Sequence, residues 1–267
     1  MIETLRKFGL LGPAGRLLAA LVVVVVGLLA VVWVGNPFLN RADPDRPAAW
    51  TMEPPPPPRT TSVVPPPPGF PTMEFPPPMP SAEPGRPQLV PTRFGLSYAV
   101  PSGKDWKASN QLVFGWSDRG GQIATFGAGS QFRRGYCGDD DGADRAMVGM
   151  SGRNGVDLDT AAREAVTNAE LVFADDETGR KPRVEITGPF DSTVSGQPAR
   201  RYTATVSEIP ETDSCSPDQA VYEIIATTGY ASAEVALLLV TRDVGTDDAL
   251  PAAEAETILQ SLQKTDK

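Results

Sequence analysis

The sequence predicts an α+β fold in which helices cover an antiparallel sheet, preceded by one transmembrane helix and a disordered, proline-rich linker. Three observations support this prediction. An uncharged apolar run occupies residues 17–35, proline dominates the region from Pro44 to Pro91, and a composition typical of globular proteins begins at Thr92. The chain is therefore divided into a tail (1–16), a membrane helix (17–35), a linker (36–91) and a domain (92–267).

The apolar run reads LLAALVVVVVGLLAVVWVG, which approaches the roughly 20 residues that a bilayer-spanning helix needs. Arg6, Lys7 and Arg16 precede it, and this basic tail favours a cytoplasmic N-terminus and an extracytoplasmic domain. A cleaved signal peptide is the alternative, but Trp33 fits poorly near a cleavage site that requires small residues. We expect a single-pass protein of the cell membrane, with the lipid bilayer as a partner of the N-terminal helix.

Residues 44–91 of the linker contain 19 of the chain's 28 prolines, including runs at 54–58, 65–68 and 76–78. Proline fixes φ and lacks a backbone donor, so neither helix nor sheet is expected there. The segment is typical of an extended polyproline II spacer. Its P-x-x-P spacings also match ligands of aromatic-lined grooves, although a tract so rich in proline contains such spacings by chance.

Strand and helix patterns alternate along the domain. Residues 157–174 predict a helix, because Leu158, Ala162 and Ala165 begin an apolar stripe at helical spacing. Pro251 opens a second predicted helix that extends to Gln263. Strands are expected over 94–100, 112–116, 122–126, 183–186, 200–206, 220–227 and 234–241. The last of these contains VALLLV, which is apolar on both faces and predicts a central strand.

Composition excludes several classes of function. The chain carries 24 Lys and Arg against 33 Asp and Glu, and this negative charge disfavours binding to nucleic acid. It contains no histidine, which removes the usual Ser-His-Asp and Cys-His catalytic arrangements and the commonest metal ligand. We therefore expect a non-catalytic protein without a cofactor or a nucleic-acid partner.

Cys137 and Cys215 are the two cysteines of the chain. In an exported domain two cysteines most simply form one disulfide, and closing so long a loop contributes roughly 3–5 kcal/mol. A reactive thiol is the alternative, but no histidine is present to activate it. The sequence predicts a Cys137–Cys215 disulfide.

Glycine and aspartate are frequent over 135–155, which predicts a loop with a short strand at 145–150. Asp139, Asp140, Asp141 and Asp144 suggest calcium as a possible ligand, but no glutamate occupies the twelfth position of an EF-hand loop. A solvated acidic loop is the preferred interpretation. The aromatic residues Tyr98, Trp106 and Trp116 are interpreted as core or rim residues, with a ligand cage as the alternative.

Short motifs of the domain resemble those of PsbP-like domains. Tyr98-Ala99-Val100-Pro101 followed by Trp106 resembles their opening hairpin, Gly196-Gln197-Pro198-Ala199 their central hairpin, and Ile258–Leu262 their C-terminal helix. LpqN-type lipoproteins of actinobacteria are similar, and the anchored, proline-spaced layout resembles actinobacterial envelope proteins. The resemblance implies an α/β/α sandwich used for binding or assembly, with a membrane helix in place of a lipidated cysteine.

Two functions are compatible with these features. The preferred one is a membrane-tethered, extracytoplasmic binding or assembly module of the cell envelope that engages an envelope protein. The alternative is a carrier or sensor of a small apolar or lipid ligand. An enzyme is the third possibility and the least favoured.

Overall fold

The computed structural model describes residues 75–138, 142–212 and 215–265. None of the helices in these ranges has the length and apolar character that crossing a membrane requires. The predicted membrane helix and most of the predicted linker lie outside the described residues. The described elements are β1 (Gln88–Pro91), β2 (Leu96–Val100), β3 (Trp106–Ala108), β4 (Phe114–Asp118), β5 (Gly121–Phe132), β6 (Ala146–Arg153), α2 (Leu158–Thr167), α3 (Ala169–Val172), β7 (Arg183–Val194), β8 (Gln197–Ser207), β9 (Gln219–Thr228), β10 (Val235–Val244), α4 (Ala252–Gln260) and β11 (Gln263–Lys264).

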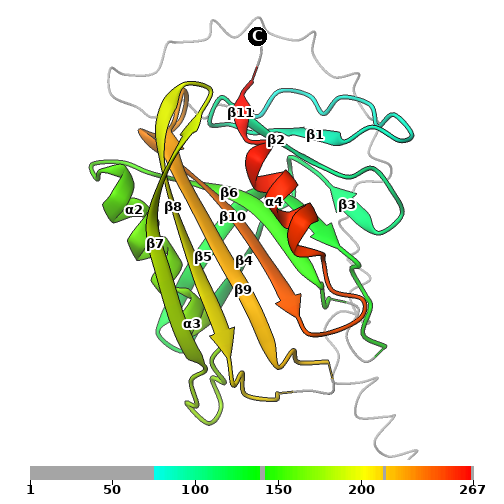
Figure 1. Ribbon diagram of the computed structural model, residues 1–267, viewed down its shortest axis with the longest axis vertical. Helices are drawn as coiled ribbons and strands as arrows, with labels where there is room; N and C mark the ends of the chain where they lie inside the picture. Colours follow the sequence, from blue (N-terminus) through cyan, green and yellow to red (C-terminus); the bar gives the residue numbers. More distant parts are fainter. Residues whose placement is uncertain (1–74, 139–141, 213–214, 266–267) are drawn as a thin grey trace, which may run out of the picture. The chain divides into compact units, whose positions relative to one another are not determined.

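A large antiparallel sheet dominates the fold (Figure 1). Its strand order is β3-β5-β6-β10-β9-β8-β7, and β4 also pairs with β5. Strand β10 lies near the middle and pairs along its length with β9 and over most of its length with β6. This position explains the apolar sequence of β10, because Leu238 and Leu239 point to opposite faces and both are fully buried.

Two apolar cores lie on the two faces of the large sheet. On one face α2 contacts β8 and β9, and its Ala162 and Val166 share a core with Tyr222 and Leu239. Asp157 caps the start of α2 by accepting a hydrogen bond from the backbone N–H of Thr160. On this face, small alanine side chains allow the helix to approach the strands closely.

The other core lies under a second, smaller sheet of order β1-β2-β11 and under α4 (Figure 1). Tyr98 of β2 and Leu259 of α4 belong to this core together with Leu238 of β10. The hydroxyl of Tyr98 donates to the carbonyl of Ala128 and lies 2.9 Å from the Ser130 Oγ. The aromatic residue of the YAV motif is thus a core residue with a satisfied hydroxyl.

The α+β, antiparallel prediction is confirmed at the level of a fold that is mostly antiparallel sheet with few helices. The predicted helix over 157–174 is interrupted at Asn168, which separates α2 from α3. The short strand expected at 145–150 is present as β6, which is longer and extends to Arg153, so less of the 135–155 region is loop than predicted. The folded region also starts before the predicted boundary at Thr92, because β1 pairs with β2 from Gln88 onward.

Candidate functional site

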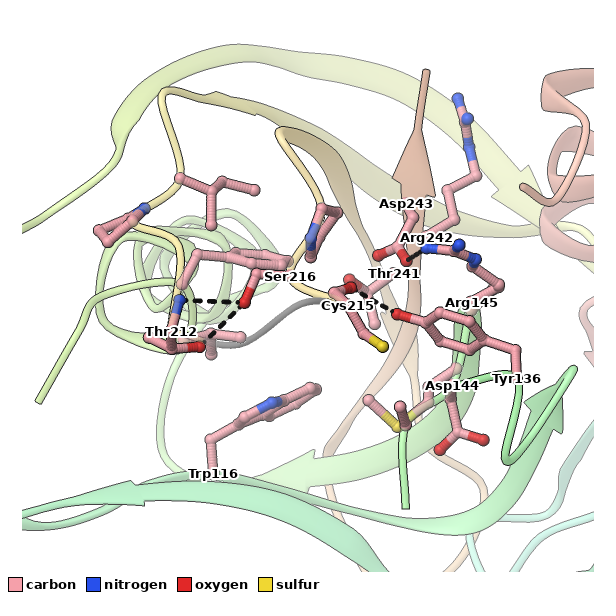
Figure 2. Close-up of a pocket in the computed structure, with 18 of the residues that line it drawn as sticks. Trp116, Tyr136, Asp144, Arg145, Thr212, Cys215, Ser216, Thr241, Arg242 and Asp243 are labelled. Carbon is pink, nitrogen blue, oxygen red and sulfur yellow. Dashed lines mark hydrogen bonds and ion pairs between the residues drawn. The ribbon is translucent and has the colours of Figure 1, made fainter. Parts of the chain in front are cut away.

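A cavity of about 250 Å³ lies at one end of the large sheet. It is lined by the start of β6, the end of β10, the end of α3 and the residues after it, the β5–β6 loop and the β8–β9 loop (Figure 2). Trp116 of β4 forms one wall (Figure 2). Because these segments are far apart in sequence, the cavity exists only in the complete fold.

One side of the cavity is apolar. Trp116 contacts Phe114, Phe126 and Tyr222 through ring pairs with centroids 5.7, 6.5 and 6.4 Å apart. These contacts fix the indole in place at the wall. Further apolar side chains on this side are Met147, Val172, Phe173, Ile209, Pro210 and Pro217.

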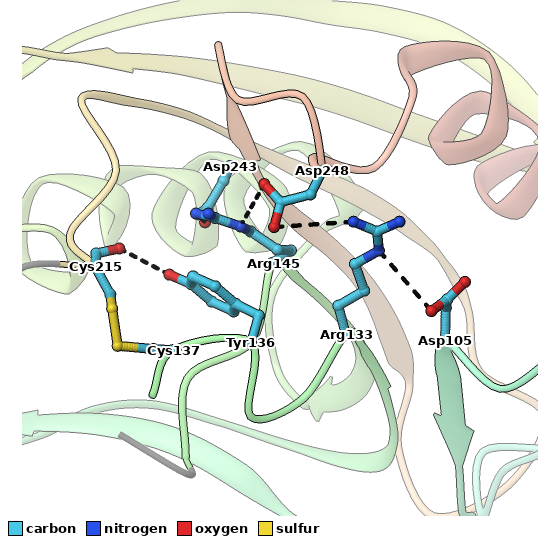
Figure 3. Close-up of polar contacts among 8 residues, drawn as sticks. All are labelled: Asp105, Arg133, Tyr136, Cys137, Arg145, Cys215, Asp243 and Asp248. Atoms are coloured by element: carbon cyan, nitrogen blue, oxygen red, sulfur yellow. Dashed lines mark hydrogen bonds and ion pairs between the residues drawn. A yellow bond between two sulfur atoms is a disulfide. The ribbon is translucent and has the colours of Figure 1, made fainter. Parts of the chain in front are cut away.

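The other side is polar and is organised by Arg145. Its guanidinium contacts Asp243 Oδ2 at 3.1 Å and Asp248 Oδ1 at 3.0 Å, and it stacks on the ring of Tyr136 with 3.6 Å between the guanidinium carbon and the ring centroid. Such stacking suits a planar guanidinium. Arg133 extends the network, lying 3.8 Å from Asp248 (Figure 3).

The two aspartates that share Arg145 have pKa values shifted in opposite directions. Burial raises the pKa of Asp243 to about 6, although the contact with Arg145 opposes this. Burial also raises the pKa of Asp248, but the hydrogen bonds and charge of Arg145 and the hydrogen bond with Thr246 together outweigh it, so the pKa of Asp248 is lowered. A buried carboxylate with a pKa near the physiological range therefore lies at the polar side of the cavity.

The predicted disulfide is confirmed and forms part of this site. Cys137 and Cys215 are bonded, with their Cα atoms 5.9 Å apart, and the bond joins the β5–β6 and β8–β9 loops (Figure 3). The hydroxyl of Tyr136 donates to the carbonyl of Cys215 at 2.7 Å, which adds a second link between the same loops. The disulfide therefore holds together the outer wall of the cavity.

The aromatic residues singled out in the sequence do not form a cage. Trp116 lines the cavity, Tyr98 is fully buried in the core, and Trp106 lies elsewhere, donating from Nε1 to Glu254 Oε1 at 3.1 Å. The core-or-rim interpretation holds for all three.

The acidic loop is only partly described. Asp139, Asp140 and Asp141 lie outside the described residues, and Asp144 is paired with Arg134 at 3.2 Å. Among the residues that the structure describes, no group of three acidic, histidine or cysteine residues is arranged to hold a metal ion.

Sequence reasoning missed Arg145, Asp243 and Tyr136. One signal was available: Arg242 and Asp243 directly follow the apolar run of β10, and charged residues that continue a central strand must be paired or reach solvent.

Comparison with known proteins gives one family. The model of a family described as a domain of unknown function (DUF8017) matches residues 79–267, a region that contains the whole cavity. No curated protein matches the chain. Among solved structures, one that is similar is the crystal structure of LpqN, involved in cell envelope biogenesis of Mycobacterium tuberculosis. The two chains are 13% identical, the match covers 67% of this chain and 80% of LpqN, and the TM-score is 0.30. A TM-score this low carries no argument about function.

Proposed function

The chain belongs to the family of the domain of unknown function DUF8017, and we propose that its folded domain is a non-catalytic binding module, tethered to the cell membrane and exposed outside the cytoplasm. The observation that carries this proposal is the cavity whose outer wall is closed by the Cys137–Cys215 disulfide. Such a preformed recess, with an apolar wall facing a polar one, is suited to binding.

The size of the cavity favours a protein partner. Its volume of about 250 Å³ is below the roughly 300–1,000 Å³ of pockets that enclose a whole small molecule. It is suited to a single anchor side chain, which is how many protein interfaces concentrate their binding energy. The residues of the two walls favour an anchor side chain whose apolar part lies beside Trp116 and whose polar end lies near Arg145 and Asp243.

The chemistry at the site supports binding rather than catalysis. The chain has no histidine, and its two cysteines are bonded to each other. Ser216 lines the cavity, but its Oγ accepts a hydrogen bond from the backbone N–H of Thr212 at 3.1 Å and lies 2.9 Å from the Thr212 hydroxyl. These two contacts tie the Ser216 hydroxyl to its own loop.

Two features support the proposed location. Disulfides persist in oxidising compartments and are rare in the cytosol. The sequence before the domain has the apolar run and the basic tail of a membrane anchor. Together they favour a domain outside the cytoplasm and, with the PsbP-like motifs, a partner among the envelope proteins.

The test is photo-crosslinking of the full-length protein in its native membranes. A benzoylphenylalanine replaces Ile209 at the cavity, and a second protein carries it at Val113, which is 63% exposed and does not line the cavity. Captured proteins and lipids are both identified. We expect a protein captured from position 209 and not from position 113, and we expect Ala143→Phe, which fills the cavity, to abolish the capture.

Two results would contradict the proposal. Capture of lipid without protein would favour a carrier or sensor of an apolar ligand, for which the apolar wall is the supporting feature. Equal capture of the protein from positions 209 and 113 would show that the cavity is not the binding site. Capture that Ala143→Phe does not reduce, with the disulfide still intact, would show the same.

A further inference from the structure

Residues 75–83 belong to the predicted linker, form no helix or strand, and contact the domain. Pro76 and Met79 are half-buried, whereas Phe75, Pro77, Pro78 and Pro80 are exposed. A polyproline II helix has three residues per turn, so the two half-buried residues lie on one side of it. That side faces the domain, and Met79 packs against its core.

The hydrogen bonds of this segment repeat the same spacing. Asn110 Nδ2 donates to the carbonyl of Pro77 at 2.6 Å, and Gln88 Nε2 donates to the carbonyl of Pro80 at 3.0 Å. Proline residues offer carbonyl acceptors but no N–H donors. Two amide side chains placed to meet carbonyls three residues apart therefore match what a polyproline II segment presents.

The surface beneath the segment includes apolar residues and the aromatic ring of Trp106. A cavity of about 330 Å³ remains between the segment, which contributes Met79, and the domain, which contributes Pro101 and Trp106. Trp106 is fixed by its hydrogen bond to Glu254 and by Phe132, whose ring centroid lies 5.2 Å away. Aromatic surfaces beside hydrogen-bond donors are the features that recognise proline-rich segments.

We propose that Gln88, Trp106 and Asn110 form a recognition groove for polyproline II segments, and that Pro76–Pro80 of the same chain occupies it in this structure. The partner that it fits is a proline-rich segment with an apolar side chain three residues after a proline. The Pro76–Pro80 segment of the same chain competes with such a partner, since a tethered segment acts at an effective concentration of about millimolar. Displacement of Met79 therefore opens the groove.

The experiment uses the full-length protein in detergent and a fluorescein-labelled peptide with the sequence of residues 72–83 as the probe, measured by fluorescence anisotropy. Met79→Asp releases the segment from the groove. Ser81→Asp adds the same charge at an exposed residue that does not line the groove and is the matched control. We expect Met79→Asp to bind the peptide at least about tenfold more tightly than the unaltered protein and Ser81→Asp do.

A second pair of variants tests the groove itself. In the Met79→Asp background, Asn110→Ala removes one hydrogen bond and is expected to weaken peptide binding about fivefold, the equivalent of about 1 kcal/mol. Trp106→Ala is expected to abolish binding. Circular dichroism and an intact disulfide establish that each variant is folded.

Three outcomes would overturn the proposal. The first is a folded Met79→Asp protein that binds the peptide no better than Ser81→Asp. The second is binding that Asn110→Ala and Trp106→Ala leave unchanged. The third is equal binding of a peptide in which the methionine at position 79 is replaced by aspartate.

Discussion

Two buried tyrosines differ in what their hydroxyl groups contact. The hydroxyl of Tyr98 donates to the carbonyl of Ala128, whereas that of Tyr222 has no hydrogen-bond partner within the described part of the chain. Burial raises the pKa of both phenols, so both stay protonated at any pH at which the domain folds. A buried hydroxyl without a partner costs free energy, whereas a satisfied one does not.

We therefore expect opposite effects from the same chemical change. Tyr222→Phe removes an unpaired polar atom and should leave the free energy of unfolding unchanged or raise it by about 1 kcal/mol. Tyr98→Phe leaves the Ala128 carbonyl and Ser130 without their partner and should lower it by about 1–2 kcal/mol. Urea unfolding monitored by circular dichroism measures both, and a loss for Tyr222→Phe equal to that for Tyr98→Phe would contradict this interpretation.

The two carboxylates on Arg145 predict opposite pH dependences. The pKa of Asp243 is raised in the folded state, so the folded protein binds this proton more tightly than the unfolded chain does, and the resulting stability is lost as pH rises from about 4 to about 6. The pKa of Asp248 is lowered, so its contribution is present above about pH 4 and is lost as pH falls through the folded value.

The measurement is the free energy of unfolding of Asp243→Asn and Asp248→Asn across about pH 3 to 7. Relative to the unaltered protein, Asp243→Asn should become more stable as pH rises, by on the order of 2–3 kcal/mol. Asp248→Asn should lose relative stability as pH rises from about 3 to about 5 and then remain level. Parallel curves for the two variants would show that the pKa values of the two carboxylates are not shifted in opposite directions.

At the scale of the element, strand β10 contributes buried residues to both cores. Leu238 packs against the small sheet and α4, and Leu239 packs on the face that carries α2. We expect Leu238→Ala and Leu239→Ala each to cost about 2–5 kcal/mol, because each leaves a cavity in a different core. Val113→Ala, at a residue 63% exposed, serves as the control and should change stability by less than about 0.5 kcal/mol. Thermal unfolding monitored by circular dichroism measures all three.

The sequence predicted some elements better than others, for identifiable reasons. Strand β10 and helix α2 were predictable because their apolar patterns match their burial. Only a short strand at 145–150 was expected where β6 lies, because the region around it is rich in aspartates and glycines. The structure shows why the glycines of β6 are there: a Cβ at Gly149 would lie 2.6 Å from Phe114, and one at Gly152 would lie 2.6 Å from Phe94. These glycines make room for aromatic rings, and that information lies in the distant rings rather than in the strand.

Some parts of the candidate site could also be predicted from the sequence, and others could not. The disulfide was predictable because the chain offers one possible pair of cysteines. The pairing of Arg145 with Asp243 was not, since 98 residues separate them and many carboxylates were available. Strand β1 was assigned to the linker because Pro91 ends it, yet proline is tolerated at the end of an edge strand.

At the scale of the whole molecule, the disulfide ties together two loops that are 78 residues apart in sequence. In the loop-entropy description this link stabilises the domain by about 4 kcal/mol. We expect the free energy of unfolding of the Cys137→Ala/Cys215→Ala protein, measured by urea unfolding, to be lower by about 4 kcal/mol. We also expect this protein to lose the capture from position 209, because the outer wall of the cavity is no longer held. If this variant kept the stability of the unaltered protein but lost the capture from position 209, the disulfide would shape the cavity without stabilising the domain.

The docking of residues 75–83 determines where the domain first bears mechanical load. Any pull on the N-terminal part of the chain reaches the Asn110–Pro77 and Gln88–Pro80 hydrogen bonds first, and then the four-residue strand β1. We expect tension on the proposed membrane tether to break these few contacts first, which would detach the segment and lengthen the tether while both cores stay folded.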